Sequence, residues 1–341
     1  EDPDWDQAFD LFESALAIDR TKVSTLVNFA NFLAEKPIPF LESNSASLNS
    51  TDSVSYALSK HQEVSQSLDL FNEAIILEPD NEEVYSNFGS VLCRVGDWEK
   101  GLDFIEKSVR LNPQHPQCQS RLGFYHMQAG NLSKAKTHLA RSLALDPSDL
   151  ETTLQLASTE ESDPSTSLDE ALRLYHHALT LNPEGAEAYF HIGKLLQMRD
   201  NDMEGSKQSF RAAIHHDPRH FSSLNSLALC LIFEGQNDEA DSLLQKALAL
   251  RPNHEGVLCN YASFLHAKRQ NHDRAEELFK KALAISPQHV QSLTGYANLK
   301  MFLNQDLDQA QSMLELANQL SPQLLEIRKN LEECQAKARR G

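Results

Sequence analysis

The chain has 341 residues, of which 31 are Lys or Arg and 49 are Asp or Glu, so its formal net charge is −18. Nucleic acids and anionic membrane surfaces are bound through clustered Lys and Arg, and this charge balance argues against both as partners. No apolar run approaches the 18 residues of a membrane span, and no signal peptide opens the chain. We therefore expect a soluble cytoplasmic protein, with the nucleus as the second location.

The five cysteines agree with a reducing compartment. Their number is odd, they are scattered, and none of them has C-x-x-C spacing. Free thiols that fill small spaces in a protein interior have this distribution. The chain begins at Glu1 without an initiator Met, and its first repeat would contain a second helix alone, so we expect a piece of a longer protein.

The first predicted element is a helix over about residues 5–18. Trp5 and Phe12 lie on one apolar stripe of this helix, which would pack on the helices that follow. Phe9 and Leu16 lie off this stripe, and we expect another helix to cover them if one preceded this one in a longer protein. This end of the chain is therefore expected to be sticky.

A long insertion separates the next predicted helix from its partner helix, which ends at Pro79. The insertion spans residues 37–62 and accounts for 25 residues beyond the usual 34. It opens with Pro37 and Pro39, which stop a helix, and continues rich in Ser and Asn. Such a composition cannot bury enough apolar area to offset the entropy of ordering. It predicts a mobile surface loop, with a helical stretch over residues 53–61 as an alternative.

After the insertion, pairs of helical segments alternate with short turns. Gly96-Asp97 and Gly130-Asn131 connect the paired helices in two units of 34 residues. In the unit over residues 150–183, the segment 160–164 lengthens the turn between the two helices. The chain ends with a predicted capping helix over residues 323–340, because apolar residues recur there at helical spacing with charges between them.

One sequence period runs through these elements. Each second helix ends at a marker residue, with a small residue five positions earlier and an apolar residue eight positions earlier. The markers are Arg20, Pro79, Pro113, Pro147, Pro183, Pro218, Pro252, Pro287 and Pro322. They are separated by 59, 34, 34, 36, 35, 34, 35 and 35 residues. Nine matches at one period indicate a repeat protein.

Each first helix carries a matching signature, a small residue directly after an apolar one. A small residue at this place lets the paired helix cross close by. The signature pairs are Phe29-Ala30, Phe88-Gly89, Leu122-Gly123, Leu156-Ala157, Ile192-Gly193, Leu227-Ala228, Tyr261-Ala262 and Tyr296-Ala297.

This pattern resembles the tetratricopeptide repeat (TPR) family, whose 34-residue helix-turn-helix unit has small residues at these places and a Pro at its end. The resemblance covers nearly the whole chain. It implies an all-α fold, a right-handed TPR superhelix (α-solenoid) of about eight repeats with extra terminal helices, over residues 1–341 as a single solenoid. Repeat scaffolds bind many unrelated partners, so the resemblance does not specify the ligand.

The sequence contains no motif that would support catalysis or bind a cofactor. We find no P-loop, nucleophile elbow, dinucleotide-binding glycines or metal-spaced Cys and His. Adjacent histidines such as His176-His177 point about 100° apart on a helix and cannot chelate together. His216 and His220 are four residues apart, but Pro218 ends the helix between them. We therefore predict no enzyme activity, no cofactor and no metal site.

The candidate site is the groove that the resemblance implies. In a TPR superhelix the first helices line the concave side, and the residue two positions before the small one points into it. In superhelical relatives such as the TPR region of O-GlcNAc transferase, Asn at this place hydrogen-bonds the backbone of an extended peptide. A merely solvated groove would also be polar. The candidates at this place are Asn28, Asn87, Arg121, Gln155, His191 and Asn260, whereas Ser226 and Gly295 occupy the remaining two.

Apolar side chains are also predicted to face this groove if the family geometry holds. They would form pockets for the apolar side chains of a bound segment, or pack against the insertion folded back. These residues are Leu154, Phe190, Leu229 and Phe233.

We therefore predict a non-enzymatic scaffold that binds a protein or an extended peptide in its concave groove. One alternative is the TPR regulatory region of a larger enzyme, for example a glycosyltransferase, whose catalytic domain lies outside this sequence. Another is a co-chaperone with a carboxylate clamp. Asn28, Asn87 and Arg121 occupy three of the clamp places, but Ser24 and Gln117 stand where the clamp has Lys. Exposed terminal repeats would in addition allow self-association.

Overall fold

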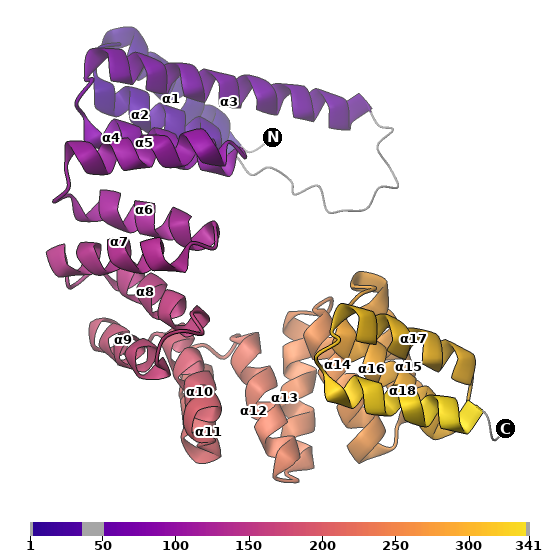
Figure 1. Cartoon of the computed structure of the whole chain (residues 1–341). Helices are drawn as coiled ribbons and strands as arrows, with labels where there is room; N and C mark the ends of the chain where they lie inside the picture. Colours follow the sequence, from indigo (N-terminus) through magenta and orange to yellow (C-terminus); the bar gives the residue numbers. More distant parts are fainter. Residues whose placement is uncertain (1–2, 36–50, 339–341) are drawn as a thin grey trace. The chain divides into compact units, whose positions relative to one another are not determined.

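The computed structural model describes residues 3–35 and 51–338 of the chain (Figure 1). These residues form helices joined by turns, and no strand occurs among them, so the predicted all-α fold is confirmed. The chain divides into two compact units, Glu1–Leu174 and Tyr175–Gly341, which we call unit 1 and unit 2. Each unit consists of consecutive helix pairs.

The helices of unit 1 follow one another as α1 (Pro3–Ile18), α2 (Val23–Glu35), α3 (Thr51–Leu77), α4 (Glu82–Arg94), α5 (Trp98–Leu111), α6 (Pro116–Gln128), α7 (Leu132–Leu145) and α8 (Leu150–Ser162). Helix α9 (Leu168–Leu181) contains the boundary between the two units. Within unit 1, α2 packs along α3, α4 along α5 and α6 along α7 (Figure 1).

The helices of unit 2 are α10 (Ala186–Asp200), α11 (Met203–His216), α12 (Phe221–Phe233), α13 (Asn237–Leu250), α14 (Glu255–Phe264), the π-helical turn η1 (Leu265–Arg269), α15 (His272–Ile285), α16 (Val290–Leu303), α17 (Leu307–Leu320) and α18 (Leu325–Ala338). Here α10 packs along α11, α12 along α13, α14 along α15 and α16 along α17. The predicted capping helix over residues 323–340 corresponds to α18, which packs on α17.

Small residues at the helix crossings allow this close pairing. A Cβ atom on Gly89 would lie 2.5 Å from the carbonyl oxygen of Gly101 and 2.5 Å from Cγ1 of Ile105. In unit 2, Ala228 and Ala262 hold the equivalent place and are fully buried. The large residues eight positions before the eight proline markers are also buried, namely Phe71, Ile105, Leu139, Tyr175, Phe210, Leu244, Phe279 and Leu314. Phe12, eight positions before Arg20, is half-buried.

The repeats differ in length at the turn between their first and second helices and at the end of the first helix. In the 34-residue units this turn contains a glycine with a positive φ, Gly96, Gly130 or Gly235. In the 35-residue units the first helix is longer by one or two residues, and the positive φ falls on Asn201, Gln270 or Asn304. The extra residue of α14 is absorbed in the π-helical turn η1. In the 36-residue unit the turn between α8 and α9 is longer, as predicted.

The insertion predicted over residues 37–62 lies partly outside the described residues, because these omit 36–50. From Thr51 to Leu77 the chain forms the single helix α3. Helix α3 therefore contains both the end of the predicted insertion and the second helix of the first repeat.

Helix α1 packs on α2 through the predicted stripe, because Phe12 stacks on Phe29 with ring centroids 5.1 Å apart and Trp5 stacks on Phe32 with centroids 5.0 Å apart. The ring of Phe9 lies against that of Phe29, with centroids 5.4 Å apart, and Leu16 is buried. Phe9 and Leu16 are therefore covered within unit 1 and need no preceding helix to cover them. The exposed apolar residues of this helix are instead Leu11 and Ile18.

The cysteines lie in the interior of the repeats. All five cysteines are free and buried, and burial raises the pKa of the Cys93 thiol to about 11. Among the described residues, no three His, Cys, Asp or Glu side chains are arranged to hold a metal ion. None of the described helices is both long enough and apolar enough to span a membrane.

Candidate functional site

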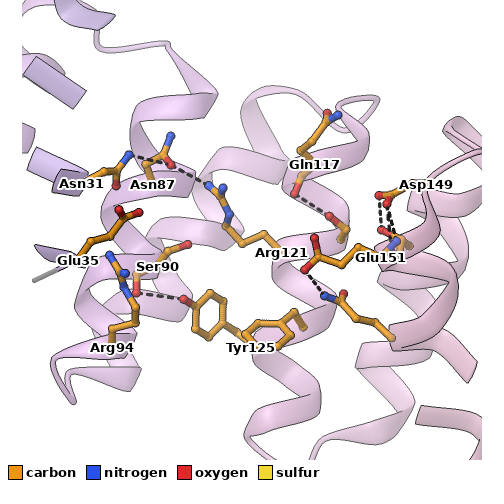
Figure 2. Close-up of a pocket in the computed structure, with 14 residues that line it drawn as sticks. Asn31, Glu35, Asn87, Ser90, Arg94, Gln117, Arg121, Tyr125, Asp149 and Glu151 are labelled. Carbon is orange, nitrogen blue, oxygen red and sulfur yellow. Dashed lines mark hydrogen bonds between the residues drawn. The ribbon is translucent and has the colours of Figure 1, made fainter. Parts of the chain in front are cut away.

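A polar pocket of about 400 Å³ lies in unit 1, along the first helices α2, α4, α6 and α8 (Figure 2). Many of its lining residues hold recurring places in the repeat: two before, one after or five after the small residue of each first helix. The residues at these places are Asn31, Glu35, Asn87, Ser90, Arg94, Arg121, Phe124 and Gln155.

A chain of hydrogen bonds links three of these helices. The Arg121 Nη1 donates to Ser86 Oγ at 2.9 Å and to Asn87 Oδ1 at 3.2 Å. The same Asn87 oxygen accepts from Asn31 Nδ2 at 3.4 Å, and Asn87 Nδ2 donates to the carbonyl of Glu83 at 2.8 Å. Neighbouring repeats are therefore joined by polar side chains on this face, as Figure 2 shows.

Arg94 and Arg121 are the two cations that line the pocket. Within the described part of the chain, neither guanidinium lies within 4.0 Å of a carboxylate, and the ion pairs of unit 1 involve other cations. Unit 1 nevertheless contains 29 acidic side chains. Neither positive charge therefore has a close carboxylate partner among the described residues.

The acidic groups of the pocket wall on α8 are already engaged. Asp149 caps this helix, because its Oδ1 accepts from the amides of Glu151 at 3.0 Å and Thr152 at 3.2 Å. Its Oδ2 accepts from the Thr152 hydroxyl at 2.6 Å. The carboxylate of Glu151 accepts from Gln155 Nε2 at 3.0 Å. These contacts all lie at the start of α8, so both carboxylates stabilise that helix.

The aromatic wall is held in place from the neighbouring repeat. The Tyr125 hydroxyl donates to the carbonyl of Ser90 at 3.0 Å. Burial raises the pKa of Tyr125, which keeps this hydroxyl neutral and a donor. Phe124 lies edge-on to Tyr125, with ring centroids 5.2 Å apart. The two rings give the pocket an apolar side beside the arginines.

The pocket brings together three of the residues predicted from the sequence, Asn87, Arg121 and Gln155. Asn28 is exposed and lines a neighbouring hollow together with Asn87. Leu154 is half-buried and does not line the pocket. The predicted groove residues of unit 1 are therefore only partly gathered at one place.

The predicted polar residues of unit 2 bond to neighbouring side chains. His191 Nε2 lies 3.1 Å from Glu187 Oε1, and its ring stacks on Tyr175 with centroids 4.9 Å apart. Asn260 Nδ2 donates to Asn225 Oδ1 at 3.0 Å. They remain candidates for contact with a ligand.

The predicted apolar residues of unit 2 differ in exposure. Phe190 packs against the hydrophobic core, whereas Leu229 is exposed. Phe233 is 83% exposed, and Met198 and Phe302 hold the same place on α10 and α16, each 64% exposed. Large apolar side chains therefore recur at the place five positions after the small residue.

Sequence reasoning missed Asn31, Ser90, Arg94 and Tyr125. The resemblance to TPR proteins pointed to the place two before the small residue alone. Because a helix has 3.6 residues per turn, the places one and five after the small residue lie on the same side. This periodicity was present in the sequence and could have found three of the four residues.

Comparisons with known proteins agree with the repeat fold. Residues 233–330 match the family model of the middle TPR-like domain of cilia and flagella-associated protein 70. Anaphase-promoting complex subunit 3 of Schizosaccharomyces pombe (strain 972 / ATCC 24843) is 32% identical over 89 residues. This match covers 26% of the present chain and spans 13% of the length of that relative.

Solved structures extend the likeness to most of the chain. The crystal structure of the APC/C hetero-tetramer Cut9–Hcn1 matches 96% of this chain and 58% of that chain, with 17% identity and a TM-score of 0.61. A tetratricopeptide repeat protein from Parabacteroides merdae ATCC 43184 matches 75% of this chain and 99% of that chain, with 17% identity and a TM-score of 0.60. At this identity the likeness shows the fold alone. Together with the repeat signatures, these matches show that the chain has a tetratricopeptide-type repeat fold.

Proposed function

We propose that the chain is a non-catalytic scaffold that holds an extended segment of a partner protein along the pocket of unit 1. The observation that supports this most is the pocket itself, because four successive first helices line it with side chains at recurring places. An extended segment presents its backbone amides and side chains at regular intervals, and a repeating surface can meet them one after another.

The side chains of the pocket offer the groups that a peptide backbone needs. An Asn or Gln amide supplies both donors and an acceptor. Among the described residues, the recorded hydrogen bonds leave the Asn31 oxygen and one N–H of Asn87 for a ligand. A bound segment could therefore use this network without breaking the contacts between repeats.

The names of two similar proteins also support a binding role. One is a subunit of the anaphase-promoting complex, and the other belongs to a structure described as an APC/C hetero-tetramer. Both descriptions concern assemblies of several chains. The present chain shares their repeat type, which supports protein partners in general and leaves the partner itself to experiment.

Site-specific photo-crosslinking in lysate tests the proposal. A photo-reactive amino acid at Ser120 places the crosslinker in the pocket, and Arg141, exposed on α7, supplies a matched position outside it. We expect partner proteins to crosslink at position 120 and not at 141. Equal crosslinking of the same partners at both positions, or crosslinking at 141 alone, would contradict the proposed groove.

A further inference from the structure

We propose that Arg94 and Arg121 together bind the carboxylate of an Asp or Glu side chain within the partner segment. This inference rests on the proposed groove function and specifies the chemistry of the partner. It concerns a side chain in the interior of the segment, which distinguishes it from the capture of a C-terminal carboxylate.

The first support is that both guanidinium groups have hydrogen-bond donors without a partner among the described residues. Arg121 is anchored through Nη1 by Ser86 and Asn87, which holds the rest of the group in a fixed direction. Its Nη2 and Nε have no recorded partner among the described residues, and Arg94 is exposed with no recorded hydrogen bond there. Guanidinium donors in a fixed fork match the two oxygens of a carboxylate.

The second support is that the nearby carboxylates in the described part of the chain itself do not pair with Arg94 or Arg121. Asp149 and Glu151 are engaged within α8, as described above. Glu35 lines the pocket on the side of Arg94 (Figure 2) but forms no ion pair with it. Glu35 is therefore the internal competitor for Arg94, and its removal should strengthen the binding of an acidic partner.

The third support concerns the choice among anions. Unit 1 contains 13 basic and 29 acidic side chains, so a doubly charged phosphate would meet more repulsion there than a single carboxylate. A clamp for a C-terminal carboxylate needs cations where this chain has Ser24 and Gln117. The rings of Phe124 and Tyr125 beside the arginines can pack against the methylene groups of a Glu side chain.

A synthetic peptide library tests this inference with the full chain. The probe is a library of 12-residue peptides with acetylated N-termini and amidated C-termini, so that no terminal carboxylate is present. We expect the bound peptides to be enriched in Asp or Glu at one position. Replacing that residue by Gln or Asn in the tightest peptide should weaken binding by about 10-fold or more.

Variants of the chain localise the effect. Arg94→Ala should weaken the tightest peptide by about 10-fold, and its fold should stay intact because its guanidinium has no recorded internal hydrogen bond. Arg110→Ala is the matched control, because Arg110 lies on α5 and pairs with Glu106 at 3.4 Å outside the pocket. This control should bind as the unaltered chain does. Glu35→Gln should bind severalfold more tightly.

The outcomes separate this inference from the proposed function. If peptides crosslink at position 120 but show no acidic preference, or if Arg94→Ala binds them unchanged, the carboxylate site is wrong and the groove proposal stands. If phosphoserine in place of the acidic residue binds 10-fold more tightly, the choice of carboxylate is wrong. If the library yields no binding peptide and no partner protein crosslinks at position 120, both proposals fall.

Discussion

Units 1 and 2 share one repeat but present opposite chemistry at equivalent places. The place five positions after the small residue is polar in unit 1, with Glu35, Arg94, Gln128 and Ser162. In unit 2 the same place holds Met198, Phe233, Ala267 and Phe302. The charges differ as well, because residues 1–174 contain 13 basic and 29 acidic side chains, and residues 175–341 contain 18 and 20.

This difference separates what folding requires from what folding leaves free. The crossing residues and the large residues that fill the pairs are buried in both units, so the repeat constrains them alike. The place five after the small residue is solvent-exposed and contributes little to the core. Exposed apolar side chains that recur at one place mark surfaces that contact something else. We therefore expect the two units to contact different chemical groups.

The substitutions with the largest expected effect on stability test whether the hydrophobic cores of the two units are equivalent. Phe71 in unit 1 and Phe279 in unit 2 hold the same place and are fully buried. Changing either to Ala should lower the free energy of unfolding by about 3–5 kcal/mol, since each removes a buried ring and leaves a cavity. Urea denaturation with hydrogen exchange resolved by unit measures both. A cost for one variant that is less than half the other would show that the cores differ.

A second change addresses the helix crossing, where Gly89 holds the place of the small residue in unit 1 and Ala228 holds it in unit 2. Gly89→Ala should destabilise unit 1 by about 1–3 kcal/mol, because the new methyl group would meet Gly101 and Ile105 at 2.5 Å. The control is Gly256→Ala in the first turn of α14, where the methyl group would meet no backbone atom of another helix. This control should be neutral or slightly stabilising. Equal destabilisation by both variants would contradict the crossing argument.

The sequence predicted the parts of the fold that repeat and was less complete for the single helix at the start of the chain. The period located the buried small residues because each must permit a close crossing in every unit. For helix α1 the spacing located the packed stripe of Trp5 and Phe12 but not its width, because apolar side chains surround this helix and Phe9 and Leu16 also pack into the core. The site was harder still. That Arg94 lacks a carboxylate partner depends on distances between repeats, which spacing along one helix does not supply.

A third change concerns the longer turn of unit 1. Lys136 on α7 donates to Asp163 in this turn at 2.6 Å and lies 3.6 Å from Glu160. The hydrogen bonds from Lys136 and Ser165 lower the pKa of Asp163 below its usual range. Lys136→Met should therefore lower the urea midpoint of unit 1 at neutral pH, by less than either change above.

The pH dependence of this effect has a definite sign. A carboxyl group with a lowered pKa in the folded state stabilises the fold above its ordinary pKa of about 3.9, and this contribution is lost as the pH falls through the folded value. The difference between the unaltered chain and Lys136→Met should thus stay constant from about pH 5 to 8 and shrink below about pH 4. A difference that grows on acidification would exclude Asp163 as the partner that matters.

The smallest effect on stability is expected at the exposed apolar places of unit 2. Phe233 is 83% exposed and Phe302 is 64% exposed, so the double change Phe233→Ser and Phe302→Ser removes little buried area. The free energy of unfolding should change by no more than about 0.5 kcal/mol for each residue. If these rings serve binding, the same variant should bind less of a hydrophobic dye and associate less with itself in sedimentation.

The matched control for this last prediction is Glu35→Ser and Gln128→Ser, at the same places in unit 1. This control should leave dye binding and sedimentation unchanged, because it removes no exposed apolar area. A loss of stability of several kcal/mol in the unit 2 variant would show that Phe233 and Phe302 belong to the fold. The two units would then differ in how these side chains pack. Phe233 and Phe302 would no longer indicate a surface that contacts a partner.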